Sequence, residues 1–197
     1  MLAYGAMSFR QFNWTEQLDM GVKFTETCYR TYELSRTGLG AESVDVQTLL
    51  GLYGQETYRL RPEVIESIFY MWRITHDPKY REWGWNIVQS IEKFCRDEVG
   101  YHGIQSSGLP SDRMESYFLA ETLKYLYLLF SDDDVLPLDQ YVFNTEAHPL
   151  SIRGHGRRKS FISVDALLDS WDKGSDVGYQ DVSNSLLQMV AKGALSE

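Results

Sequence analysis

Apolar residues recur at every third or fourth position in several long segments of this chain, and this spacing constrains the fold more than any other feature of the sequence. Such spacing places apolar side chains on one stripe of an α-helix, where they can be buried together. The pattern predicts helices over residues 14–35, 62–76, 78–97 and 112–131. His76-Asp77-Pro78 separates the second helix from the third, so these two are expected to form an antiparallel hairpin.

The stretch from Leu123 to Phe130 is the most apolar part of the chain, and it is apolar nearly all round the helix, which predicts burial between layers. Tyr141 to Asn144 is expected to form either a short strand or an extended entry into a site. The chain is therefore expected to be all-α, built from helix hairpins with few short strands. A basic, glycine-rich linker begins at Arg153, so we assign residues 1–152 to one domain and leave 153–197 as an unassigned, flexible tail.

The charge balance argues against a nucleic-acid-binding protein. The formal net charge is −9 and the sequence pI is about 4.9, whereas phosphate recognition depends mainly on Lys and Arg.

The apolar stretch at Leu123 to Phe130 is far shorter than the roughly 18 residues that a membrane-spanning helix needs. The first residues lack the pattern of a secretory signal. Cys28 and Cys95 can form one disulfide at most, and either Cys28 or Tyr29 completes the apolar stripe of the first helix.

Arg61-Pro62-Glu63 stands where a loop meets a helix, which places Glu63 in the first helical turn. The partial positive charge of the helix end favours an ionised carboxylate there, as a general base requires. Arg61 can pair with a carboxylate or donate to a substrate oxygen, and Glu66 follows Glu63 on the same face. A purely structural interpretation, with Glu63 complementing the helix dipole and Arg61 in an ion pair, remains open.

Tyr117 and Glu121 are four residues apart, so an aromatic ring and a carboxylate are expected on one helix face, where they could stack a sugar ring and accept its hydroxyls. A partly buried Tyr with a solvated Glu is the alternative. In the segment Phe143 to Pro149, Thr145 offers a hydroxyl and a carbonyl beside the Glu146 carboxylate. Oxygen donors of these types suit a hard cation such as calcium.

The motifs RPE at 61–63, MESYFLAETLKYLYLLFSDDD at 114–134 and FNTEAHPL at 143–150, in this order, resemble class I α-1,2-mannosidases of glycoside hydrolase family 47. The resemblance covers residues 1–152. It implies a partial (αα)7 barrel, a bound calcium ion, and hydrolysis of α-1,2-linked mannose from high-mannose N-glycans with inversion. It also implies the lumen of the endoplasmic reticulum or Golgi, although this chain shows neither a targeting signal nor the membrane anchor that family members often carry.

The resemblance assigns a role to each candidate residue. Glu63 matches the favoured general base, and Thr145 matches the residue whose hydroxyl and carbonyl both bind calcium. The positions that match substrate-binding residues are Arg61, Glu66, Tyr117, Glu121 and Glu146. Tyr117 stands where the family commonly has Phe, a change that keeps the ring.

The resemblance also implies what this chain lacks. The acid of the family pattern matches no residue here, so we expect no mannose release by this polypeptide alone. Cys28 matches one cysteine of the family disulfide without its usual mate, and the apolar face from Leu123 to Phe130 is expected to be uncovered. Two other functions stay open: a non-catalytic, calcium-dependent module that binds mannose glycans in glycoprotein quality control, and an α-helical interaction scaffold.

Overall fold

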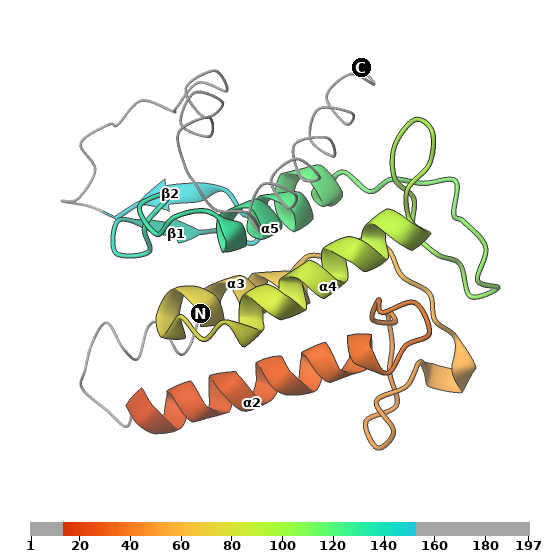
Figure 1. The fold of residues 1–197 in the computed structure, drawn as a ribbon, viewed down its shortest axis with the longest axis horizontal. Coiled ribbons are helices and arrows are strands. Elements are labelled where there is room, and N and C mark those ends of the chain that lie inside the picture. The colour runs from red at the N-terminus through yellow and green to blue at the C-terminus, as the bar shows by residue number, and fades with distance from the viewer. Residues whose placement is uncertain (1–13, 153–197) are drawn as a thin grey trace.

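A computed structural model describes residues 14–152, and the tail predicted at 153–197 lies outside these residues. Helices dominate the described part of the chain, and two short strands follow them, as predicted (Figure 1). The elements in chain order are α2 (Trp14–Glu33), η1 (Leu52–Gly54), α3 (Glu63–Thr75), α4 (Lys79–Phe94), η2 (Phe118–Thr122), α5 (Leu123–Phe130), β1 (Tyr141–Phe143) and β2 (Pro149–Ser151).

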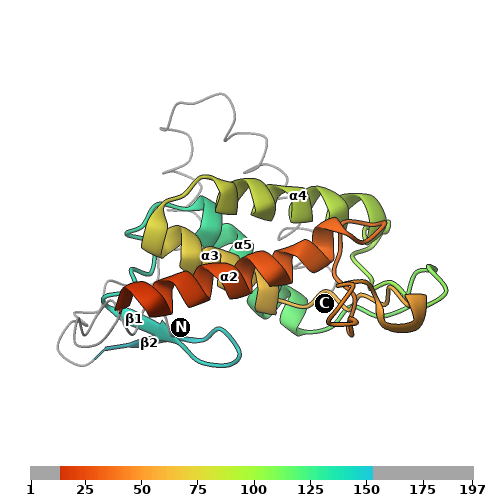
Figure 2. The same ribbon diagram turned by 90° about the horizontal axis from the view of Figure 1, so that it is seen from below.

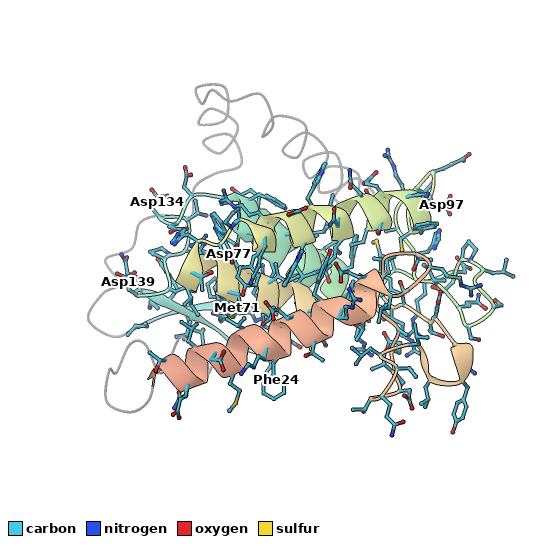
Figure 3. The ribbon with its side chains drawn as sticks, turned by 60° about the horizontal axis from the view of Figure 1, so that its bottom comes forward. Phe24, Met71, Asp77, Asp97, Asp134 and Asp139 are labelled. Atoms are coloured by element: carbon cyan, nitrogen blue, oxygen red, sulfur yellow. The ribbon has the colours of Figure 1, made fainter. Side chains whose placement is uncertain are left out.

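Helix α3 lies at the centre of the packing, in contact with α2, α4 and α5 (Figures 1 and 2). Its sequence suits that place, because the four consecutive residues from Ile68 to Met71 are all buried, and four consecutive residues point to all sides of a helix. Helix α2 is buried on one side only. On that side Tyr29 stacks on Trp83 with ring centroids 4.3 Å apart. Phe24 points outward from the opposite side of the helix and is 65% exposed (Figure 3).

The hairpin of α3 and α4 forms as predicted. His76 takes a left-handed conformation, with φ of 53°, and its N–H donates to the Trp72 carbonyl, which ends α3. Pro78 then precedes the first residue of α4. Arg73, almost fully buried, donates to the carbonyls of the segment that follows α5, and one of its bonds reaches the Leu128 carbonyl at 3.1 Å. The hairpin therefore caps the end of α5.

Two expectations about the last helix are wrong. Leu123 to Phe130 is not an uncovered face, because α3 and α4 pack on it and leave Leu126 and Leu129 fully buried. The helix also does not begin at residue 112. The backbone before it is used in loop pairing, since the Ser111 N–H donates to the Gly103 carbonyl and the Gly103 N–H to the Arg113 carbonyl. Helical structure begins only near Tyr117.

Strands β1 and β2 form an antiparallel pair in which Phe143 faces Pro149, so the connecting residues 144–148 make a tight turn. Cys28 is exposed, Cys95 is buried, and both are free. Because Tyr29 is buried and Cys28 is not, Tyr29 and not Cys28 belongs to the apolar stripe of α2. Within residues 14–152, no helix combines the length and apolar character needed to cross a bilayer.

Candidate active site

Arg61 is held in place beside Glu63. Its Nε donates to both carboxylate oxygens of Glu42, at 3.0 and 2.8 Å, and its Nη1 lies 3.8 Å from Oε1 of Glu63. The guanidinium also lies 5.7 Å from the centre of the Tyr117 ring. Because Glu42 binds the Nε, the orientation of the guanidinium is set before any ligand arrives.

Two hydrogen bonds join the loop before α3 to the start of the last helix. The Tyr117 hydroxyl donates to the Arg59 carbonyl at 2.7 Å, and the Thr122 hydroxyl donates to the Leu60 carbonyl at 2.6 Å. Leu60 is fully buried and has a positive φ of 60°, a conformation that a leucine keeps only when its surroundings enforce it. These bonds set the position of Arg61 and Glu63 relative to Glu121.

Glu121 lies in a π-helical turn, η2, in which the Leu123 N–H donates to the Phe118 carbonyl. Such turns are frequent at functional sites. Burial raises the pKa of Glu121, and the negative charges of Glu63 and Glu146 raise it further. Carboxylates from two other segments of the chain therefore act on Glu121.

Glu66 belongs to the same group. Burial raises its pKa, as do the charges of Glu121 and Glu63, while a hydrogen bond with Tyr125 opposes the shift. The pKa of Tyr125 is raised in turn, first by its burial and then by the charge of Glu66. Glu121 thus links the four carboxylates Glu63, Glu66, Glu121 and Glu146, which are called the acidic cluster below: the charges of Glu63 and Glu146 act on Glu121, and the charge of Glu121 acts on Glu66.

Thr145 lies in the turn between β1 and β2 and is exposed. The Asn144 side chain closes this turn, because its Oδ1 accepts the N–H groups of Glu146 at 3.0 Å and of His148 at 2.8 Å. The Thr145 hydroxyl and carbonyl receive no hydrogen bond from any residue of the described chain. Both oxygens are therefore available to a cation, and their hard donor character fits calcium.

The carboxylates do not form a metal cage of their own. In the part of the chain that the structure describes, no group of three or more His, Cys, Asp or Glu side chains is arranged to hold a metal ion. Calcium generally takes about six to eight oxygen ligands. A calcium ion at Thr145 would consequently need water molecules or substrate hydroxyls to complete its coordination.

Sequence reasoning missed several residues of this site. Glu42 accepts the hydrogen bond that orients Arg61, but it lies nineteen positions earlier in the chain. No local pattern in the sequence marks such a contact. Thr122 and Tyr125 read as ordinary members of an apolar helix. Lys124 carries the one available signal, because a charge interrupts the most apolar stretch of the chain; its Nζ donates to the Ala147 carbonyl at 2.9 Å.

Comparison with known proteins decides the family. The model of glycosyl hydrolase family 47 matches residues 1–152 of this chain. The chain belongs to this family. It is 47% identical over 160 residues to human mannosyl-oligosaccharide 1,2-alpha-mannosidase IB, covering 77% of this chain and 25% of that protein. It is 49% identical over 163 residues to the Drosophila melanogaster alpha-1,2-mannosidase IA, covering 78% of this chain and 24% of the relative.

A solved structure agrees with this family. An alpha-1,2-mannosidase from Trichoderma reesei matches with a TM-score of 0.65 and 33% sequence identity, over 77% of this chain and 37% of that enzyme. The resemblance drawn from the motifs is thus confirmed, and the chain is a member of a glycosidase family whose mostly helical fold it shares. The chain spans about a quarter of the length of the family 47 relatives named above.

Proposed function

We propose that this chain carries the general-base and calcium-binding part of an α-1,2-mannosidase active site, which removes α-1,2-linked mannose from high-mannose N-glycans with inversion at the anomeric carbon. Family membership and the mannosidase activity in the relatives' names support this assignment. The observation that carries it is the grouping of Glu63, Glu66 and Glu121, whose charges act on one another, with Glu146 of the turn that bears Thr145.

Glu63 is the proposed general base. It is the first residue of α3 and its side chain is 63% exposed, so a water molecule can reach it. The partial positive charge of the helix end stabilises its carboxylate. That carboxylate would accept a proton from the water while the water oxygen attacks the anomeric carbon. Arg61 and the Tyr117 ring border the same space and would contact the sugar.

Thr145 is the proposed calcium ligand, through its hydroxyl and its carbonyl. The ion would place a positive charge among the carboxylates and orient sugar hydroxyls by coordination. Glu66, Glu121 and Glu146 would then bind waters and substrate hydroxyls around it. Because burial and mutual repulsion raise the pKa values of Glu66 and Glu121, a nearby cation would favour their ionised forms.

Inversion also needs a carboxylic acid that protonates the leaving oxygen, and none of the family motifs in this chain supplies it. We therefore propose that this polypeptide alone does not release mannose, and that its helices form part of an (αα)7 barrel completed by other parts of a family 47 domain. Loss of one acid or base group typically costs about 10²- to 10⁴-fold in rate. One relative is named for the endoplasmic reticulum, which supports a place in the secretory pathway.

Calorimetry and mass spectrometry test these assignments. Calcium should bind to the wild-type chain and to Thr145→Ser, but not measurably to Thr145→Val, which keeps the carbonyl and loses the hydroxyl. A high-mannose glycan incubated with the chain and calcium should keep its mass. Joining the chain to the remaining part of a relative's domain should release mannose only while Glu63 is intact, with Glu63→Gln as the control. Equal calcium affinity in Thr145→Val, or mannose release by the chain alone that Glu63→Gln abolishes, would contradict the proposal.

A further inference from the structure

We propose that Lys124 is a positioning residue that holds the Thr145 turn against the start of α5, so that calcium meets a turn already in place. The hydrogen bond from Lys124 to the turn stands independently of any ligand; the consequence for calcium rests on the function proposed above. Lys124 has no assigned role in the cluster described so far.

The contact joins two parts of the site that are distant in the sequence. Lys124 is the second residue of α5, three positions after Glu121, and its Nζ donates to the Ala147 carbonyl at 2.9 Å. Ala147 stands two positions after Thr145. A half-buried ammonium group is costly unless it is paired, and this lysine meets that need with a backbone carbonyl of the turn and the negative charge of Glu121.

The turn has an internal shape but needs anchors to fix its place. The Asn144 side chain binds the N–H groups of Glu146 and His148, which closes the turn on itself without attaching it to a helix. Before Thr145, the Phe143 ring packs edge-on against Phe69 and Tyr125, with centroids 6.0 and 5.7 Å apart. After Thr145, the Lys124 hydrogen bond provides the second anchor.

The backbone at the second anchor is held in an uncommon conformation. Ala147 is fully buried and has a φ of 55°, which a residue other than glycine adopts only where its surroundings over-determine it. The Lys124 hydrogen bond is one of those constraints. Without it, the turn would keep its strand pairing and its Phe143 anchor but could rotate about them, and the two oxygens of Thr145 would lose their fixed direction.

Substitution of Lys124 tests the inference in two readouts. Lys124→Met removes both charge and donor, Lys124→Arg keeps them, and Lys23→Met is a control, because Lys23 lies on the exposed side of α2 with Asp19. Without calcium, amide hydrogen exchange of the 143–151 segment should become at least about tenfold faster in Lys124→Met and stay near the wild-type rate in the other two variants. The calcium dissociation constant should rise about 10- to 100-fold in Lys124→Met, as for other residues that support a metal ligand, and Lys124→Arg should restore most of the affinity.

The outcomes separate this inference from the proposed function. Unchanged exchange of the 143–151 segment in Lys124→Met overturns the positioning role, whatever calcium does. If Lys124→Met does not fold, Lys124→Ala takes its place, since alanine carries neither a charge nor a donor, and unchanged exchange in that variant has the same meaning. Absence of calcium binding by the wild type contradicts the proposed function instead, while accelerated exchange would still support the role of Lys124.

Discussion

Thr122→Val should destabilise the fold because it removes one buried hydroxyl group that donates a hydrogen bond. The Thr122 hydroxyl donates to the Leu60 carbonyl at 2.6 Å, and both residues are fully buried. Valine has nearly the same shape but no donor, so the packing is kept and the carbonyl loses its partner. Among residues 14–152, no other donor reaches that carbonyl. The substitution therefore leaves a buried polar group unsatisfied.

The expected loss follows from the cost of an unsatisfied buried group, about 1–3 kcal/mol. Each 1.4 kcal/mol changes the unfolding equilibrium about tenfold. With a urea m-value of about 2 kcal/mol/M, the unfolding midpoint should fall by about 0.5–1.5 M. Tryptophan fluorescence during urea unfolding measures this midpoint, and the chain has 5 tryptophans to report it.

Thr25→Val is the matched control. Thr25 is also buried, and its hydroxyl donates to the Gly21 carbonyl at 2.8 Å. That carbonyl lies inside α2, however, where it also accepts a backbone N–H from the next turn. Removing the hydroxyl leaves it satisfied, so the loss should stay below about 0.5 kcal/mol. Equal losses in Thr25→Val and Thr122→Val would refute the reasoning, because the cost would then belong to the hydroxyl and not to the orphaned carbonyl.

Two further predictions concern the stability of the same region. The pKa of Glu66 is raised above its usual value of 4.5, chiefly by burial. The Glu66 carboxyl therefore contributes fully to the free energy of unfolding below about pH 4.5, and this contribution is lost as the pH rises through the folded-state pKa. Glu66→Gln should therefore gain stability relative to the wild type between pH 4 and 7 in urea titrations, and a constant difference over that range would contradict this sign. A Cβ at position 103 would lie 2.5 Å from the Tyr58 carbonyl oxygen, so Gly103→Ala should cost about 1–3 kcal/mol. Gly100→Ala, which meets only the Met114 sulfur at 3.8 Å, should cost less in the same thermal unfolding assay.

Local patterns in the sequence determined the helices and the hairpin of this protein. Apolar spacing depends only on neighbouring residues, and so do the effects of His76 and Pro78 on the backbone. For this reason α3 begins and ends within one residue of its predicted bounds, and α4 begins within one residue of them but ends three residues earlier. The order of the motifs determined the family for the same reason, because it is a property of the chain itself. The assignment of Glu63 and Thr145 came from that family pattern and stays a prediction.

Only the tertiary structure decided which partners those residues meet. Glu42 orients Arg61 and Lys124 holds Ala147, and each pair joins segments that are far apart along the chain. The last helix likewise starts later than its apolar pattern suggests, since the preceding backbone pairs with the loop at Gly103. Such contacts depend on how the helices pack and on which buried polar groups need a partner. A one-dimensional pattern does not contain that information, because packing is decided by all the segments together.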